Sequence, residues 1–347
     1  MPRMLAVIVV LATAGLGACS GEGRRPVPET VTVAAEPGPP WVSAVRRHHS
    51  LAGRIWRPSE NAFVDRHEVL AALAKSPFVL VGEKHDNVDH HAIQAWLLAR
   101  LMAGGRRPTV AFEMLTTDQE ARLADYLAAH PRQAAGLGDA VAWGKSGWPD
   151  WSTYRPIAQA ALDGGAPIVA AGLARKTLRA IAEKGIEALD DGEKGLVGPY
   201  RALPPRLALR MKKRIVESHC HMLPAPMIDP MLTVQTVKDA AMAATLVRGG
   251  QAAGRDGAVL IAGNGHVRDD LGVPWHLRRM APGKAVATIG LLEVEEGVDD
   301  PSAYAAGFGG GTPPFTFLWF SPRVDNTDPC EKYAEQLRRM GKKRAKP

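Results

Sequence analysis

Short runs of apolar residues alternate along this chain with longer segments whose apolar residues recur at helical spacing. Runs this short, bounded by Gly, Pro or charged residues, are typical of buried strands. The strand candidates are FVLVG (78–82), TVAFE (109–113), PIVAAG (167–172), AVLIAGNG (258–265), AVATIGLLEV (285–294) and FTFLWF (315–320). Strands that are apolar throughout, rather than alternating, predict a sheet covered on both faces.

The segment between the first two strand candidates predicts a helix. Asp86 or Asn87 can serve as its N-cap, and Gly104 and Gly105 end it. Its apolar face is formed by Ile93, Trp96, Leu97, Leu98 and Leu101. Strand and helix therefore alternate, and we predict an α/β fold with a mostly parallel central sheet, helices on both faces and Rossmann-like layering.

Polar residues follow three of the predicted strands. GEKH (82–85) follows the first strand, Glu113 ends the second, and GNGH (263–266) follows the fourth. In open parallel sheets, ligands bind beyond the carboxyl ends of the strands. We therefore expect Glu83, His85, Glu113 and His266 to meet in one pocket at that edge of the sheet.

These four residues suit two kinds of chemistry. Imidazole and carboxylate are common ligands of Fe, Mn and Zn, so Glu83, His85, Glu113 and His266 are candidate ligands of a divalent metal. The same groups can instead act as general acid and base. In either case we expect removal of His85 or His266 to cost little stability, because a functional cluster is stabilised mainly by its ligand.

Two further histidine pairs are ambiguous. His90 and His91 are adjacent in the predicted helix and point about 100° apart, so one of them can face the sheet edge. One of them can therefore be a metal ligand. The alternative is a structural role for the pair, in which one His lies on the surface and the other packs at the start of the helix. His219 and His221 in ESHCHM form a second metal candidate, although HxH on a helix points its rings to different sides.

The amino terminus is typical of an exported protein. Residues 1–18 read as a signal peptide, with Arg3 as the basic segment and 4–14 as the apolar segment. Leu16-Gly17-Ala18 before Cys19 resembles a bacterial lipobox, which makes Cys19 the expected lipidation site; the alternative is a plain signal peptide with an incidental Cys. Ser20 after that Cys favours outer-membrane sorting in a Gram-negative host.

Composition divides the rest of the chain. Residues 19–40 are rich in Pro, Gly and charge and predict a flexible tether, 41–323 form the expected α/β domain, and 324–347 form a basic tail. The net charge of +7 equals the charge of Arg3 plus the basic residues of RRMGKKRAKP, so the domain has no net charge and nucleic acid is not an expected partner. Cys220 and Cys330 can form one disulfide or none in an oxidising compartment.

Several segments together resemble the ChaN-like haem-binding lipoproteins of the Tiki superfamily. They are LVGEKHDNVDHHAIQAWLL, VAFEML, WSTYRPIAQAAL, PIVAAGLAR, QTVKDAAMA and GNGHVRDDLGVPWHL. The resemblance places functional positions at Glu83, His85, Glu113 and His266, with Asp239 and Met242 in the QTVKDAAMA segment. One departure is AAGLAR after the third strand, where the family pattern has an Asn.

The resemblance implies two classes of function. The first is an outer-membrane lipoprotein that binds haem or iron for uptake, with a His or a Tyr such as Tyr154 as axial ligand and His90 or His91 as further candidates. The second is a metal-dependent hydrolase of the Tiki or erythromycin-esterase type, in which Glu83 or Glu113 activates a water. No G-x-S-x-G nucleophile motif occurs. We favour haem or iron binding in the cell envelope, with membrane contact through the anchor and a homodimer left open.

Overall fold

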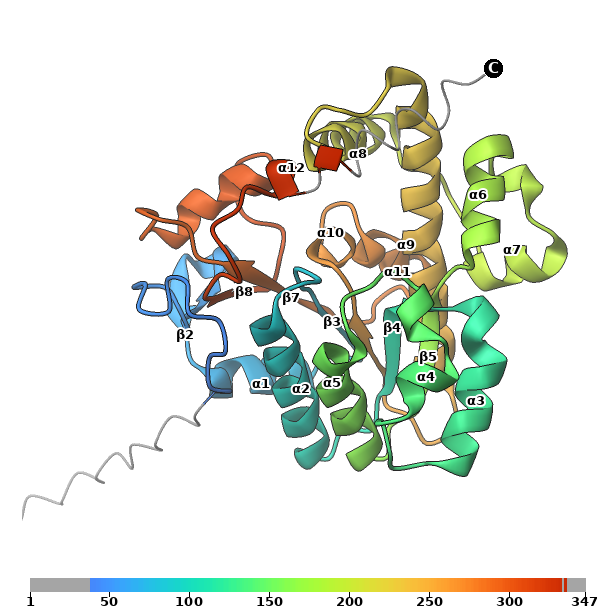
Figure 1. Cartoon of the computed structure of the whole chain (residues 1–347), viewed down its shortest axis with the longest axis horizontal. Coiled ribbons are helices and arrows are strands. Elements are labelled where there is room, and N and C mark those ends of the chain that lie inside the picture. The colour runs from blue at the N-terminus through green and yellow to red at the C-terminus, as the bar shows by residue number, and fades with distance from the viewer. Residues whose placement is uncertain (1–37, 333, 336–347) are drawn as a thin grey trace, which may run out of the picture. The chain divides into compact units, whose positions relative to one another are not determined.

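A mostly parallel sheet of eight strands forms the centre of the protein (Figure 1). This computed structural model describes residues 38–332, 334 and 335. The strands are β1 (Ile55–Arg57), β2 (Ala62–Val64), β3 (Phe78–Val81), β4 (Thr109–Thr116), β5 (Ile168–Gly172), β6 (Ala258–Ile261), β7 (Val286–Glu293) and β8 (Phe317–Ser321). The predicted strand runs correspond to β3 through β8, which confirms the α/β prediction.

The strands lie in the order β2-β1-β8-β7-β3-β6-β4-β5. Pairing is parallel from β8 to β5, and β1 pairs antiparallel with both β2 and β8. The sequence pattern missed β1 and β2, because strands of three residues are too short to show a periodicity. The missed strands lie at one edge, so the core of the sheet is the predicted one.

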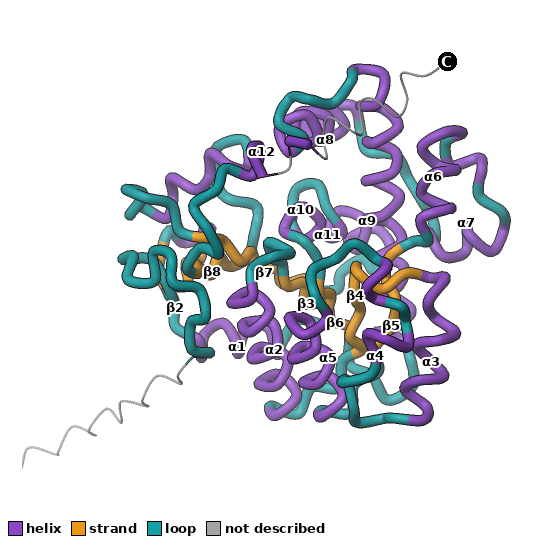
Figure 2. The backbone as a smooth tube through the Cα atoms, viewed as in Figure 1, coloured by secondary structure: helices purple, strands orange, loops and turns teal. Residues whose placement is uncertain are grey.

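Helices cover both faces of the sheet (Figure 2). The α-helices are α1 (Arg66–Ala74), α2 (Val88–Ala103), α3 (Glu120–Ala129), α4 (Leu137–Ala140), α5 (Trp151–Asp163), α6 (Arg175–Lys184), α7 (Asp191–Val197), α8 (Pro205–Ser218), α9 (Ile228–Gln251), α10 (Asn264–Val267), α11 (Val273–Met280) and α12 (Pro329–Lys332). Short 3-10 helices are η1 (Pro58–Glu60), η2 (Thr117–Gln119), η3 (Trp143–Lys145), η4 (Ile186–Ala188), η5 (Ala225–Met227) and η6 (Pro301–Phe308). Asn87 caps α2 and Gly104 ends it, as predicted.

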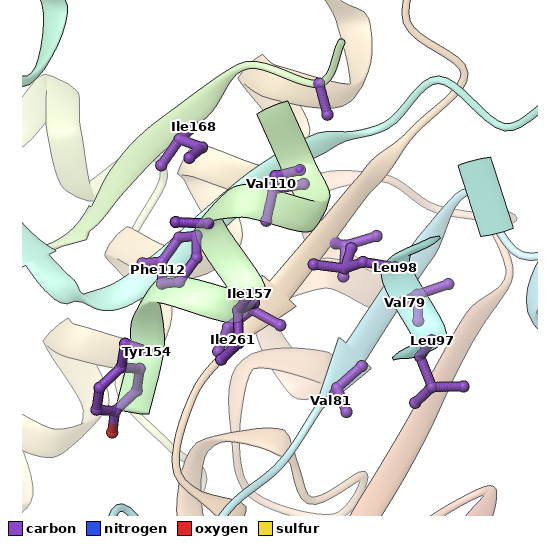
Figure 3. Packing of buried hydrophobic residues seen from close by; sticks show 14 of the residues in the cluster. Val79, Val81, Leu97, Leu98, Val110, Phe112, Tyr154, Ile157, Ile168 and Ile261 are labelled. Atoms are coloured by element: carbon purple, nitrogen blue, oxygen red, sulfur yellow. The ribbon is translucent and has the colours of Figure 1, made fainter. Parts of the chain in front are cut away.

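Successive strand residues pack against different helices because their side chains alternate between the two faces. Val79 and Val81 belong to one buried cluster with Leu97 of α2 and Ile157 of α5 (Figure 3). Leu80, between them, packs on the opposite face in a cluster that includes residues of α9 and α11. The central strands are thus buried on both sides, which explains why their sequences are apolar throughout.

Residues 324–332 are attached to the domain, where we expected a basic tail to begin. A disulfide joins Cys330 in α12 to Cys220 after α8, which settles the alternative left open by the sequence. Lys332 forms ion pairs with Asp86 and Asp325 at 2.8 and 2.7 Å. These contacts show that the folded domain extends to at least Lys332.

The predicted signal peptide, Cys19 and most of the tether lie outside the described residues. None of the helices within the described part of the chain has the length and apolar composition needed to cross a membrane.

Candidate functional site

The three polar motifs lie at the carboxyl ends of neighbouring parallel strands. β3, β6 and β4 are adjacent in the sheet. Glu83 and His85 follow β3, Glu113 lies in β4 just past its last pairing with β6, and His266 lies in α10 directly after β6. The structure therefore brings these four residues to one edge of the sheet.

Glu83 is a buried carboxylate that holds three aromatic side chains. Its Oε1 lies 2.7 Å from the Tyr154 hydroxyl, which donates to it, and 2.7 Å from Nδ1 of His85. Its Oε2 lies 3.2 Å from Nε2 of His91. Burial alone would raise the pKa of Glu83, but the hydrogen bond with His85 and the close contact with His91 outweigh it and hold that pKa well below its usual range. Glu83 is therefore an anion that fixes the His85 ring.

His85 presents one ring nitrogen away from this carboxylate. Its side chain is 34% exposed, whereas that of Glu83 is fully buried. Within the described chain, Nδ1 has a hydrogen-bond partner in Glu83 and Nε2 has none. Burial lowers the pKa of His85. The hydrogen bond and charge of Glu83 raise this pKa by a larger amount, so the net shift is upward. The ring lies 4.6 Å, centroid to centroid, from that of the half-buried Trp148.

Glu113 and His266 form a second cluster with two residues of α9. Oε1 of Glu113 lies 2.8 Å from Nζ of Lys238 and 3.0 Å from Nε2 of His266. On the other side of the ring, Nδ1 of His266 lies 2.5 Å from Oδ1 of Asp239. Burial lowers the pKa of His266, but the carboxylates of Glu113 and Asp239 outweigh it and raise that pKa to about 9. His266 is therefore a buried imidazolium between two carboxylates.

Gly263 separates the two clusters. Its N–H donates to Oε2 of Glu113 at 2.9 Å. A Cβ at this position would lie 2.8 Å from Nε2 of His85 and 3.8 Å from Oε2 of Glu113. A residue with a side chain would thus fill the space in front of the His85 ring, which explains why a Gly begins GNGH.

Several candidate residues have structural partners instead of an open face. Nδ1 of the buried His90 accepts the Lys84 N–H at 2.9 Å, and its Nε2 lies 2.8 Å from the Ser321 hydroxyl. His91 is also buried and faces Glu83, so neither member of the pair lies on the surface. Tyr154 is fully buried with its hydroxyl on Glu83, and it supports that carboxylate rather than presenting its oxygen at a surface.

Met242 and the HxH pair lie apart from this arrangement. Met242 lies almost one turn of α9 after Asp239. Its side chain is fully buried in the apolar cluster that also contains Leu246. His219 is the C-cap of α8, and its Nδ1 lies 2.7 Å from the carbonyl of Ile215. His221 follows in a left-handed backbone conformation, so the pair does not lie on a helix.

The arrangement does not support the predicted shared metal site. Among residues 38–332, 334 and 335, no group of three or more His, Cys, Asp or Glu side chains is placed to hold a metal ion. The physical reason is visible at Glu113 and His266, where the ammonium of Lys238 lies 2.8 and 3.1 Å from the two groups. A side-chain cation thus lies against both of these expected ligands, which also contact each other directly at 3.0 Å.

Two further residues of the site, Lys238 and Trp148, were not predicted from the sequence. Lys238 adjoins Asp239 in the QTVKDAAMA segment, and Gln235 one turn earlier also reaches His266, at 2.9 Å. The i, i+4 spacing of Gln235 and Asp239 was the available signal, since it places both on one helix face. Trp148 lies in a loop without periodicity, so nothing in its local sequence pointed to His85.

Comparison with solved structures finds a protein of similar fold. A structure described as cofacial heme binding to ChaN of Campylobacter jejuni is similar at a TM-score of 0.58 and 19% identity, covering 76% of this chain and 95% of that one. The type III effector HopBA1 matches at a TM-score of 0.42 and 11% identity, over 79% of this chain and 98% of that one. An erythromycin esterase mutant, EreC, in its open conformation matches at 0.35 and 16%, over 65% and 72%.

Comparison with protein families is more specific. No curated protein matches the chain. Residues 69–277 match the family described as haem-binding uptake, Tiki superfamily, ChaN, and this range includes every residue of the two clusters. The chain belongs to the ChaN family of haem-binding uptake proteins in the Tiki superfamily.

Proposed function

We propose that this protein binds haem for haem or iron uptake, with Nε2 of His85 as the axial ligand of the iron. One observation carries the assignment to His85: its ring is partly exposed, while a buried carboxylate holds its other nitrogen. A carboxylate on Nδ1 fixes the tautomer and orientation of a ligating His and makes Nε2 more basic. The family match supports haem as the ligand.

The surroundings of His85 fit a haem better than those of the other candidates. Trp148 beside the ring offers an apolar surface for a porphyrin. His266 is 8% exposed and both of its nitrogens already face carboxylates. Tyr154 would have to leave Glu83 and the core to reach a ligand. When bound, haem would supply an iron centre, and this chain would orient His85 towards it.

A haemin titration of the full chain tests the proposal. We expect a shifted Soret band that saturates at a fixed haem-to-protein ratio. A metal analysis of the same sample tests the alternative, a metal-dependent hydrolase. Stoichiometric metal with no Soret shift would overturn haem binding and support the hydrolase. Size-exclusion chromatography with and without haemin tests whether a homodimer forms, since cofacial haem binding is described for the Campylobacter jejuni structure.

Substitution of Gly263 by Ala should block haem binding. The added Cβ would lie 2.8 Å from Nε2 of His85, closer than such contacts normally come, and would occupy the approach to that nitrogen. We expect the Soret shift to be lost or the affinity to fall by at least about tenfold, the equivalent of about 1.4 kcal/mol.

Gly265→Ala is the matched control, because a Cβ there meets no atom within 4 Å. Both variants lie in the same GNGH segment. Equal haem affinity for the two would show that the space in front of His85 is not the haem site.

We further propose that the protein is an outer-membrane lipoprotein anchored through Cys19. The support is the lipobox-like Leu16-Gly17-Ala18 before Cys19 and the Ser that follows it. Cys19→Ala should abolish labelling with palmitate and release the protein from the membrane fraction or leave it uncleaved. If this variant fractionates with the membrane and is labelled with palmitate as the wild type is, the lipid anchor is refuted.

A further inference from the structure

A small basic cavity lies between α8, the segment after α10 and the end of η6. Its volume is about 120 Å³. The basic residues that line it are Arg210, Lys213 and Arg214 of α8, which lie at helical spacing on one face, and Arg268, two residues after His266. At about 30 Å³ for each water molecule of the liquid, this space holds one small anionic group and is too small for a haem.

The carboxylates around the cavity are already shared. Arg268 is buried at 3% exposure and donates to both oxygens of Asp270, at 2.6 Å from Nε and 2.9 Å from Nη2. Arg210 pairs with the same Asp270. Glu217 lies 3.7 Å from Lys213 on the exposed side. Four basic side chains therefore face two acidic ones.

Arg214 has no direct carboxylate partner. Within the described chain it has no hydrogen bond or ion pair, and it is half-buried beside the cavity. Burial and the neighbouring guanidinium of Arg268 lower the pKa of Arg214, and together they outweigh the charge of Glu217, which raises it. Holding two guanidinium groups together away from water is unfavourable unless an anion joins them.

We propose that this cavity binds a phosphate group, held by the guanidinium groups of Arg214 and Arg268. The two positive charges left over match the charge of about −1.5 to −2 that a phosphomonoester carries at pH 7. The planar guanidinium donates paired hydrogen bonds that fit phosphate oxygens. The phosphate comes either from solution or from a lipid headgroup, since both present the same oxygens. This proposal is independent of haem binding at His85.

The test uses the full chain and the variant Arg214→Gln. Inorganic phosphate is titrated by calorimetry, and thermal melts are recorded in phosphate and in a phosphate-free buffer. Vesicles of phosphatidylcholine with and without phosphatidic acid distinguish a headgroup from the free ion. Arg206→Gln is the control, because Arg206 is an exposed residue at the start of the same helix and does not line the cavity.

We expect Arg214→Gln to weaken binding of inorganic phosphate, or of the phosphatidic acid vesicles, by at least about tenfold, because the variant loses a positive charge and the charge-assisted hydrogen bonds it donates. Arg206→Gln should bind as wild type does. In phosphate-free buffer, Arg214→Gln should melt no lower than wild type, since it removes a half-buried charge that has no direct ion-pair partner within the described chain. Lys213→Gln, at an exposed lining position, should weaken binding in the same direction and by a smaller factor.

Equal responses of wild type and Arg214→Gln to both phosphate sources would overturn the proposal. So would a lower melting temperature of Arg214→Gln with an unchanged phosphate response, because Arg214 would then be structural. Haemin titration of Arg214→Gln should match that of wild type, which separates failure of the phosphate site from failure of the haem site.

Discussion

His85→Ala is expected to abolish the Soret shift that haemin produces with the wild-type protein. The variant removes Nε2, the one ring nitrogen of His85 that has no partner within the described chain. Loss of a hydrogen bond that only supports a metal ligand costs about 10- to 100-fold in affinity, so loss of the ligand itself should cost about 100-fold or more. Optical titration and calorimetry with haemin measure both effects.

The same variant should remain folded. The carboxylate of Glu83 keeps the Tyr154 hydroxyl and His91, so we expect a loss of about 1–2 kcal/mol in the free energy of unfolding. His67→Ala on the surface of α1 is the control for removal of an imidazole. If His85→Ala and His67→Ala bind haem equally well, the axial ligand is another residue.

Acidification should weaken haem binding before it unfolds the protein. An imidazolium cannot ligate iron, and Glu83 raises the pKa of His85 above its ordinary value of 6.5. Affinity should therefore fall as the pH drops through this raised pKa and recover on the alkaline side. A pH-independent affinity between pH 5 and 8 would contradict ligation by His85.

His266→Ala is expected to destabilise the fold strongly. It leaves the buried carboxylates of Asp239 and Glu113 without the imidazolium that lies between them. Removing one partner of a buried ion pair costs about 3–5 kcal/mol, comparable to the 2–5 kcal/mol expected for truncating a core residue such as Leu80 or Ile261. Urea denaturation of His266→Ala and Leu80→Ala, with His67→Ala as control, measures these differences.

The stability that His266 contributes should depend on pH with a defined sign. Its pKa is raised from 6.5 to about 9 in the folded protein, so the contribution is fully present below about pH 6.5 and is lost as the pH rises through about 9. Wild type should lose stability across this window, and His266→Ala should not. A cost of less than about 1 kcal/mol for His266→Ala, or the same alkaline loss in the variant, would show that His266 is not a buried cation.

Strong destabilisation by His266→Ala would correct part of the interpretation made from the sequence. The pattern G-x-x-H occurs twice, and it led us to expect that both histidines could be removed at little cost. The structure separates them by burial: the side chain of His85 is 34% exposed and that of His266 is 8% exposed. A repeated motif predicts that both histidines follow a strand end. The residues packed around each strand end decide whether that His is accessible to a ligand.

The parallel part of the sheet, and the edge at which the site lies, follow from the amino-acid sequence alone. Strands buried on both faces must be apolar throughout, so β3 through β8 were visible as runs, and the polar residues after β3, β4 and β6 had to lie at the same end of parallel strands. The helix between β3 and β4 was equally visible, because Asn87 and Gly104 act on their immediate neighbours. These features depend on contacts that are local or repeat regularly.

The partners of each polar side chain depend instead on contacts between residues far apart in the chain. Lys238 reaches Glu113 across 125 positions, and Tyr154 reaches Glu83 across 71. The Cys220–Cys330 disulfide spans 110 positions. No local pattern records such contacts, because they depend on how α5, α9 and α12 pack on the sheet and not on the residues that flank each group. For that reason the sequence predicted a metal site from the carboxylates and imidazoles that do meet, while the packing of α9 placed the ammonium of Lys238 against both Glu113 and His266.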